Sequence, residues 1–453
     1  TLAQRLSQMY RWPIHSIGSY TLMEEIDQDV GGDELITTAT GVYNKESGEE
    51  EKNERAVVGR YMVGQVSVRD HNGNLLRGWP ANISFPAWYN PSIGDLNGDG
   101  NNEIVIASGM KNSGRFNSEI YAFDKYGNLL DGWPVWYPSG TFYQTTLADL
   151  NNDNKLEIIV PSKSGNRRFP PDGGLHVLNE NGNELEGWPK TFDEHYSYQP
   201  VAIGDVDNDG NKEIVVAAFV SRGKTNIKNT KLYIFKGDGS SLEGWPKTLG
   251  DIDEYFFLDK DEYLFGEFGY DATAPSLVDL DGDGDLEIIF SVEDKIYILH
   301  HTGEFFEGWP REIDQGVDEV SISSASIGNI DPENEDLEII FSSMFSYTSL
   351  NDVVSGTKLH VFHSDGSYVN GWPIEICRNE IRRLNYINSL EPIILDINAD
   401  GYNDILSTCA ISAIYNNIYA FNNEGNILDG WPKKVLYNSM FDDNGGTDGI
   451  SLG

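Results

Sequence analysis

The chain has 453 residues, and its 72 Asp and Glu against 32 Lys and Arg give a formal net charge of −40. A surface this acidic repels nucleic acids and anionic membranes, so the composition argues against both as partners. No apolar run reaches the roughly eighteen residues that span a bilayer, and no signal peptide is visible before Thr1. We therefore expect a processed chain, or a piece of a longer one.

Short acidic loops recur along the chain, beginning clearly at Asp95. They carry oxygen side chains at positions 1, 3, 5 and 9, a glycine such as Gly100 for the tight turn, and a backbone carbonyl at position 7. A hard cation that takes about six to eight oxygens explains this spacing, so we predict about five Ca²⁺ sites. The predicted ligands are Asp95, Asn97, Asp99, Asn101, Glu103, Asp149, Asn151, Asp153, Lys155, Glu157, Asp205, Asp207, Asp209, Asn211, Glu213, Asp279, Asp281, Asp283, Asp285, Glu287, Asp396, Asn398, Asp400, Tyr402 and Asp404.

The residues that follow each loop predict strands. The first half of the loop resembles an EF-hand loop, but the Glu at position 12 is missing. The run after it, such as Ile104-Val-Ile-Ala, is short and β-branched, which is typical of a strand and not of an exit helix. A metal-free Asp/Asn/Gly turn is the alternative for any single copy, and five copies in register favour the metal.

Two further copies, at residues 25–34 and 329–338, have one extra residue before the closing acid. An insertion there is expected to splay the oxygen cage. We interpret these segments as the first and sixth repeats and leave open whether they bind metal.

Gly-Trp-Pro is the second recurring motif. Its tryptophans lie 54 to 64 residues apart, at Trp79, Trp133, Trp188, Trp245, Trp309, Trp372 and Trp431. A hairpin pattern precedes each motif, such as Ile120–Asp124, a turn at Gly127 and then Leu129. Each repeat is thus expected to hold four strands, the fourth ending in Gly-Trp-Pro. The Trp is interpreted as a packing anchor between repeats, with sugar stacking as the alternative.

Seven repeats of four short strands predict an all-β, seven-bladed β-propeller of antiparallel blades, with the acidic loop between the first and second strand. We expect one domain over 1–453. Its blades are assigned to residues 15–80, 81–135, 136–190, 191–247, 248–311, 312–374 and 375–436, with 437–453 as a C-terminal tail. Trp12-Pro13 is a further copy of the motif ending, so eight blades are the alternative. If the propeller has seven blades, Trp12 and Trp431 should lie side by side where the ring closes.

These motifs resemble the FG-GAP or VCBS repeats of integrin α-subunit-like propellers. The resemblance implies a calcium-binding loop in each blade, and it covers adhesion receptors, lectins, bacterial surface proteins and calcium-dependent polysaccharide lyases. The Phe-Gly and Gly-Ala-Pro signatures of integrins are absent, and the Gly-Trp-Pro ending looks more like microbial surface proteins of this class. Fold alone does not settle function.

The face opposite the acidic loops is expected to carry the variable segments, and variable loops on a rigid scaffold commonly bind ligands. We assign to it loops 44–60, 111–117, 163–173, 221–230 and 344–356 and connectors 249–274 and 374–390. Its candidate ligand-binding cations are Lys111, Arg115, Arg167, Arg168, Arg222 and Lys224. Aromatic residues accompany them at Trp88, Tyr89, Phe116, Trp136, Tyr137, Tyr143, Phe169, Tyr196 and Tyr198. Cations beside aromatic rings suit an anionic or sugar ligand, while solvated cations and inter-blade packing are the alternative.

No catalytic motif stands out. The eight His residues fall into no metal-ligand spacing, and His300-His301 before the turn at Gly303 is expected to be solvent-exposed. The sequence thus favours a non-catalytic, calcium-stabilised propeller, extracellular or at the cell surface, that binds a glycan or a partner protein. The alternatives are a calcium-dependent polysaccharide lyase, with Arg167, Arg168 or Arg222 near a uronate, and a self-assembling sheath or filament subunit. A bridge between Cys377 and Cys409 is geometrically conceivable.

Overall fold

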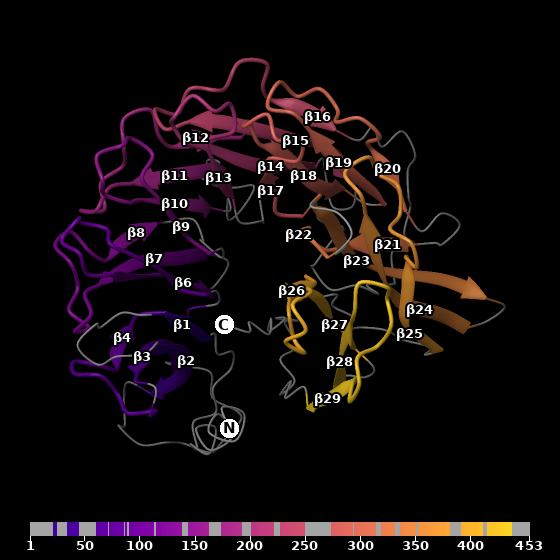
Figure 1. Cartoon of the computed structure of the whole chain (residues 1–453). Coiled ribbons are helices and arrows are strands. Elements are labelled where there is room, and N and C mark those ends of the chain that lie inside the picture. The colour runs from indigo at the N-terminus through magenta and orange to yellow at the C-terminus, as the bar shows by residue number, and fades with distance from the viewer. Residues whose placement is uncertain are drawn as a thin grey trace. The chain divides into compact units, whose positions relative to one another are not determined.

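The protein is seen in a computed structural model (Figure 1). The structure describes residues 21–24, 34–44, 60–70, 72–85, 87, 90–112, 115–137, 144–162, 174–192, 201–221, 227–249, 273–292, 294–313, 319–330, 336–349, 352–380, 391–410 and 415–436. These residues form 29 β-strands and no helix, which confirms the all-β class.

The strands form seven antiparallel sheets, and each sheet is built from one continuous segment in chain order (Figure 1). Sheet 1 holds β1 (Thr21–Glu24), β2 (Glu34–Asn44), β3 (Arg60–Arg69) and β4 (Ala81–Ile83). Sheet 2 holds β5 (Ser92–Gly94), β6 (Glu103–Asn112), β7 (Arg115–Phe123) and β8 (Val135–Tyr137). Sheet 3 holds β9 (Thr146–Ala148), β10 (Glu157–Ser162), β11 (Gly174–Leu178) and β12 (Lys190–Thr191).

The later sheets repeat this pattern. Sheet 4 holds β13 (Ala202–Gly204), β14 (Glu213–Ser221), β15 (Ile227–Lys236) and β16 (Lys247–Leu249). Sheet 5 holds β17 (Ser276–Val278), β18 (Glu287–Val292), β19 (Lys295–Leu299) and β20 (Arg311–Glu312). Sheet 6 holds β22 (Ser326–Gly328), β23 (Glu338–Ser349), β24 (Asp352–Phe362) and β25 (Ile374–Glu380), and β21 (Glu319–Ile322) adds a fifth strand beside β23. Sheet 7 holds β26 (Ile393–Leu395), β27 (Asp404–Ala410), β28 (Tyr415–Phe421) and β29 (Lys433–Leu436).

The second strand of sheet 2 is apolar on both faces because sheets 1 and 3 pack against its two sides. On β6, Ile104, Val105 and Ile106 are all fully buried. Ile104 and Ile106 pack in one cluster with sheet 1, whereas Val105 packs in another with sheet 3. Stacked antiparallel meanders of this kind are consistent with a propeller-like arrangement.

The chain clusters into two compact units, Thr1–Pro200 with Asp448–Gly453, and Val201–Thr447. Sheets 1 to 3 belong to the first unit and sheets 4 to 7 to the second. The single closed ring and its blade number stay predictions. Trp12, on which the prediction about ring closure depends, lies outside the described residues.

The fourth strand was placed wrongly by the sequence pattern. It begins after Gly-Trp-Pro and does not end in it: in sheet 2, Leu129 makes only a single bridge to Phe123, and the strand proper is Val135–Tyr137. The reason is local, because Gly132 has a φ of 94° and the following proline has no N–H to give to the ladder. Sheet 2 therefore extends to residue 137, two beyond the predicted blade boundary.

The recurring position of the motif tryptophan is explained by packing between neighbouring sheets. Trp79 is 6% exposed, its indole N–H donates to the carbonyl of Lys125 at 3.0 Å, and its ring meets Phe123 edge-on with centroids 5.7 Å apart. A Cβ on Gly78 would lie 1.7 Å from the carbonyl oxygen of Tyr126, so only glycine fits this approach. The same indole bond recurs from Trp133 to Glu180, Trp245 to His301, Trp309 to Ser364 and Trp372 to Asn423. The interpretation as a packing anchor is confirmed.

Two of the predicted variable loops are strands. Lys111 pairs with Phe116 and Asn112 with Arg115, so the described residues of the predicted loop 111–117 lie at the end of a hairpin. The described residues of the predicted loop 344–356 likewise pair with one another as the distal part of the β23–β24 hairpin. The predicted connector 374–390 begins with β25.

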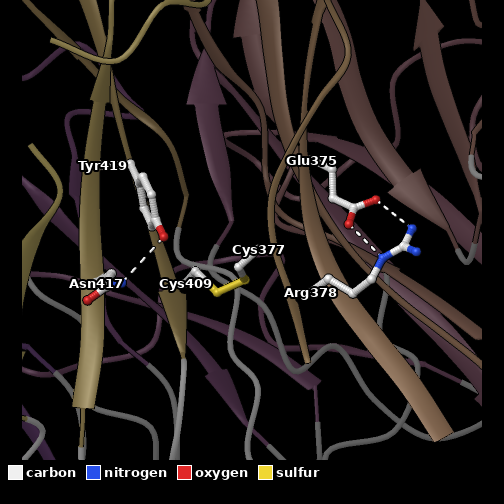
Figure 2. The surroundings of a disulfide bond; sticks show 6 residues. All are labelled: Glu375, Cys377, Arg378, Cys409, Asn417 and Tyr419. Carbon is white, nitrogen blue, oxygen red and sulfur yellow. Dashed lines mark hydrogen bonds and ion pairs between the residues drawn. A yellow bond between two sulfur atoms is a disulfide. The ribbon is translucent and has the colours of Figure 1, made fainter. Parts of the chain in front are cut away.

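A disulfide joins Cys377 on β25 to Cys409 on β27, with Cα atoms 6.4 Å apart, and so links sheets 6 and 7 (Figure 2). Beside it, Arg378 forms a two-pronged ion pair with Glu375 at 2.7 and 2.9 Å.

Candidate metal centres in the acidic loops

Each acidic loop lies between the first and second strand of its sheet, as predicted. We number them by sheet: loop 2 (95–103), loop 3 (149–157), loop 4 (205–213), loop 5 (279–287), loop 6 (329–338) and loop 7 (396–404). Residues 25–33 of the first repeat lie outside the described residues, and Glu34 begins β2.

The loops are wound by hydrogen bonds from their own backbone. In loop 2, the Asp95 carboxylate accepts from the N–H groups of Gly98, Asp99 and Gly100 at 2.8 to 3.0 Å. The Asp99 carboxylate accepts from the N–H of Asn101 at 2.8 Å. The first residue makes corresponding bonds in loops 3, 4, 5 and 7, through Asp149, Asp205, Asp279 and Asp396. The acids at positions 1 and 5 thus fix the backbone of the loop through these hydrogen bonds, and their carboxylate oxygens are also candidate metal ligands.

Two positions adopt left-handed backbone in loops 2, 3, 4, 5 and 7. Position 6 was expected to do so, and Gly100 has a φ of 87°. Position 4 does the same, and it is filled by Asn208 in loop 4 and Ala399 in loop 7, with φ of 54° and 59°. Left-handed backbone at these two positions winds the loop tightly enough to turn the side chains at 1, 3 and 5 to one side.

The closing acid at position 9 is the first residue of the second strand, and it is buried. Glu213 and Glu287 are fully buried, and Glu103 and Glu157 are 2% exposed. One carboxylate oxygen accepts from the backbone N–H of position 2 at 2.8 to 3.0 Å in all six loops, from Leu96, Leu150, Val206, Leu280, Ile330 and Ile397.

Burial has an electrostatic consequence for these acids. It raises the pKa of Glu103, Glu157 and Glu213 to about 7, with neighbouring loop carboxylates adding to the shift and the backbone N–H opposing it. Burial also raises the pKa of Glu287 and of Asp404. A cation beside these carboxylates would favour their ionised form.

The second oxygen of the closing acid has a different neighbour in different loops. In loops 2 and 3 the side-chain amide at position 3 donates to it, from Asn97 to Glu103 at 3.5 Å and from Asn151 to Glu157 at 3.0 Å. In loop 4, Oε1 of Glu213 is buried and has no hydrogen-bond partner.

Loop 4 gathers three carboxylates around that oxygen. Asp205, Asp207 and Glu213 each place an oxygen within 4.8 Å of the others. Oδ1 of Asp207 is also buried and without a hydrogen-bond partner. The Lys236 ammonium lies 3.0 Å from Asp209 and 3.5 Å from Asp207.

Loop 5 has histidine where loop 4 has lysine. Asp281, Glu287 and His300 have ligand atoms within 4.8 Å of one another, and Asp279, Asp281 and Asp283 form a second such group. Nδ1 of His300 lies 3.0 Å from Oε1 of Glu287, and His301 pairs with Asp285. The expectation that these histidines are solvent-exposed was wrong, because their side chains are only 30% and 31% exposed.

Loop 6 keeps its closing acid despite the extra residue. Glu338 is fully buried and accepts from the N–H of Ile330 at 2.8 Å, so the insertion does not displace it. Residues 331–335 lie outside the described residues, and metal binding there stays open.

Loops 2, 3 and 7 bring fewer carboxylates together because position 3 is Asn97, Asn151 or Asn398. At position 7 of loops 3 and 7, the backbone N–H donates to the acid at position 5. The side chains at position 7 differ: Lys155 pairs with Glu180 at 2.6 Å, and Tyr402 is 53% exposed. The full predicted ligand set thus stays a prediction.

The candidate ligand-binding cations are only partly described. Lys111 and Arg115 lie on neighbouring strands at the tip of the β6–β7 hairpin. Arg167, Arg168, Arg222 and Lys224 lie outside the described residues, as do Trp88, Tyr89, Tyr143, Phe169, Tyr196 and Tyr198. Trp136 on β8 is 56% exposed, whereas its neighbour Tyr137 is 7% exposed and packs edge-on against His176.

The residue that most distinguishes the loops was missed by the sequence motif. It lies at the end of the third strand or directly after it, three residues before the turn glycine. It is Asp124, Asn179, Lys236, His300, His363 and Asn422 in sheets 2 to 7. A search at a fixed interval from the turn glycine would have found it.

Among the described residues, no helix is long and apolar enough to cross a membrane.

Solved structures resemble this chain weakly. Solved structures similar to this chain include the V. cholerae biofilm matrix protein Bap1 (12% identity, 78% of this chain and 81% of that chain, TM-score 0.33). They also include the Pseudomonas aeruginosa PilY1 C-terminal domain (11% identity, 71% of this chain and 79% of that chain, TM-score 0.41). A third is BBS1N in complex with ARL6DN (9% identity, 94% of this chain and 97% of that chain, TM-score 0.40). Such weak likenesses say nothing of what this chain binds. No curated protein matches it.

The FG-GAP-like repeat family matches residues 95–160, which run from the start of loop 2 through loop 3 into β10. The chain thus carries an FG-GAP-like repeat.

Proposed function

We propose that this protein is a non-catalytic, calcium-stabilised binding module of the cell surface or extracellular space, and that its ligand is a glycan or a partner protein. Calcium is the natural ion for loops that present carboxylate and amide oxygens and leave several positions for water. Extracellular modules bind calcium at the high concentrations found outside cells, and a net charge of −40 suits a chain that takes up several divalent cations.

The observation that carries the calcium proposal is the buried carboxylate of Glu213. One of its oxygens accepts from Val206, and the other has no hydrogen-bond partner although the side chain is fully buried. An unsatisfied buried carboxylate oxygen costs about 1–3 kcal/mol or more. A cation shared with Asp205 and Asp207 would remove that cost, and those two residues already have oxygens within 4.8 Å.

The proposed ligand surface lies at the end of each sheet opposite the acidic loop. In sheet 2 the loop ends at Glu103, where β6 begins, and the β6–β7 tip carries Lys111 and Arg115. Trp136, more than half exposed on the adjoining strand β8, offers a flat ring. Cationic side chains and an exposed aromatic ring on one sheet would suit an anionic sugar.

Calcium titration calorimetry and thermal unfolding test the metal. Removing calcium should lower the melting temperature strongly, because each occupied site stabilises the folded state by about 2.7 kcal/mol at a hundredfold excess over Kd. A melting temperature unchanged by chelator would overturn the metal assignment.

A glycan array probed in calcium tests the ligand. Trp136→Ala should reduce binding, and Tyr126→Ala is the matched control, because Tyr126 is 45% exposed in the turn near loop 2 on the same sheet. Equal binding by wild type and Trp136→Ala would contradict this surface. Release of unsaturated sugar ends from uronate polymers would identify a lyase instead.

A further inference from the structure

Loop 5 combines oxygen and nitrogen donors at one point. Asp281, Glu287 and His300 each present a ligand atom within 4.8 Å of the other two. The contact between Nδ1 of His300 and Oε1 of Glu287, at 3.0 Å, brings the imidazole to the same carboxylate oxygen that is unpartnered in loop 4. The closing acid of loop 5 thus faces a nitrogen donor at the point where a cation would bind.

The three donors are held by their surroundings. His300 starts a tight turn, in which its N–H donates to Glu304 at 3.0 Å and its carbonyl accepts from Gly303 at 2.8 Å. Its ring lies against Phe306, with centroids 5.0 Å apart. The indole of Trp245 donates to the carbonyl of His301 at 2.6 Å, which ties the turn to the preceding sheet. Metal sites are strongest when the ligands are fixed in this way before the ion arrives.

Glu287 is fixed from the other side. It is fully buried and its second oxygen accepts from the N–H of Leu280 at 2.8 Å. Asp281 is exposed and its carboxylate accepts from the N–H of Asp283 at 3.3 Å. Two ligands therefore come from rigid elements and one from the loop, which leaves one side of the site open to water.

The donor set selects the ion. Calcium and magnesium take oxygen ligands, whereas imidazole nitrogen suits zinc, cobalt, nickel and copper. Sheets 2, 3 and 7 have the oxygen-bearing residues Asp124, Asn179 and Asn422 at this turn position. His363 of sheet 6 is farther from its closing acid, at 3.8 Å from Glu338.

We propose that loop 5 is a transition-metal site, with zinc held by Asp281, Glu287 and His300 and water completing the coordination. Two carboxylates, one imidazole and a water molecule make the four-coordinate set that zinc favours. The contrast with the other loops rests on the calcium function proposed above, but the loop 5 site itself does not need calcium elsewhere.

Zinc titration of the full-length chain saturated with calcium tests the assignment. Wild type should bind one equivalent of Zn²⁺ that a large excess of Ca²⁺ does not displace, and Co²⁺ at the same site should give a visible absorption band. His300→Asn introduces the residue that sheets 3 and 7 already carry at this position, so it should fold. Losing an outer-shell partner alone costs about 10–100-fold in metal affinity, so loss of this ligand should weaken zinc at least about tenfold.

His363→Asn is the matched control and should leave zinc binding unchanged. Zinc affinity that is equal in wild type and His300→Asn, or lowered equally by both variants, would overturn the proposal. Should His300→Asn fail to fold, Asp281→Asn removes a ligand from the exposed loop, and unchanged zinc binding there would overturn it as well. Zinc binding that depends on His300 in a chain that does not bind calcium would refute the proposed function and support this site.

Discussion

Loops 4 and 5 are built on the same scaffold and differ in the residue that starts the turn after the third strand. Both have three or more acids in the loop and a fully buried closing Glu whose carboxylate accepts from position 2. In loop 4, Lys236 places a positive charge 3.0 Å from Asp209, whereas in loop 5 His300 places a nitrogen 3.0 Å from Glu287. The acidic motif therefore shapes the loop, and under the proposals above a residue from outside the motif would tune which cation the loop prefers.

The largest expected effect comes from removing the clamp that holds the loop 5 turn. Trp245 is 7% exposed and packs among the side chains of sheets 4 and 5, while its indole donates to His301. Trp245→Ala should lower the free energy of unfolding by about 3–5 kcal/mol, because a large cavity replaces the ring. Chemical denaturation measures this.

Trp133→Ala is the comparison variant, since Trp133 makes the corresponding bond to Glu180 in sheet 3. It should cost about the same stability without changing zinc binding at loop 5. If Trp245→Ala and Trp133→Ala both lower stability and neither changes zinc affinity, the bond from Trp245 to His301 would have no role in positioning His300.

The second effect concerns the closing acid of loop 4. Glu213→Gln keeps an acceptor for the N–H of Val206 but removes a charge that is fully buried. The metal-free variant should be as stable as wild type or more so, since the unpaired charge is gone. It should lose up to about 2.7 kcal/mol of the stabilisation by calcium at a hundredfold excess over Kd.

Thermal unfolding with calcium and with chelator separates these two effects. Glu186→Gln, at an exposed position of the turn between β11 and β12, is the control and should change neither curve. A calcium response of wild-type size in Glu213→Gln would show that loop 4 holds no calcium.

Much of the scaffold was predictable from sequence because its signals are local. The acidic loops, the β-branched strands after them and the packing role of the Gly-Trp-Pro tryptophans each depend on a few adjacent residues. The start of the fourth strand was not predictable in this way, because Gly132 and Pro134 turn the chain before pairing resumes at Val135. Alternating apolar residues before the motif imitate a strand without forming one.

The candidate site was predictable only in part. His300 and Lys236 follow their closing acids by 13 and 23 residues, because the hairpins between them differ in length. No fixed spacing links such residues to the loop, and only strand pairing brings them together. The tip of the hairpin at 111–117 was mistaken for a loop for a related reason, since Lys, Asn and Arg there resemble loop residues although they pair.

The third effect is a change of stability with pH, and it distinguishes metal-free from loaded loops. Burial raises the pKa of Glu103, Glu157 and Glu213 to about 7, above the ordinary value of 4.5 for the unfolded chain. Between these values the folded state binds more protons, so metal-free protein should lose stability as the pH rises from about 5 to above 7. Each group should contribute on the order of 1 kcal/mol.

Calcium should reverse this slope because it binds the ionised carboxylate. Melting temperatures at pH 5, 6, 7 and 8, with chelator and with calcium, should therefore diverge as the pH rises. In Glu213→Gln, the loss of stability of the metal-free protein with rising pH should be smaller by the contribution of one carboxyl group. Glu186→Gln should leave this loss unchanged. Parallel curves with and without calcium would contradict the coupling of these acids to metal binding.

The smallest effect tests the lysine of loop 4. Lys236 is 36% exposed at its side chain, and its bond to Asp209 raises the pKa of the ammonium, so it stays charged and competes with a cation for Asp207 and Asp209. Lys236→Asn gives loop 4 the turn residue of sheets 3 and 7. Because exposed ion pairs contribute about 1 kcal/mol or less, calcium should bind loop 4 up to about fivefold more tightly. The gain should shrink at high salt, where the lysine charge is screened.

Calorimetry at low and high salt measures the gain in affinity and its salt dependence. Lys247→Asn, on the fourth strand of the same sheet, is the charge-matched control. If the calcium affinity of Lys236→Asn equals that of wild type, the lysine would not compete with the cation. The proposed difference in cation preference between loops 4 and 5 would then depend on His300 alone.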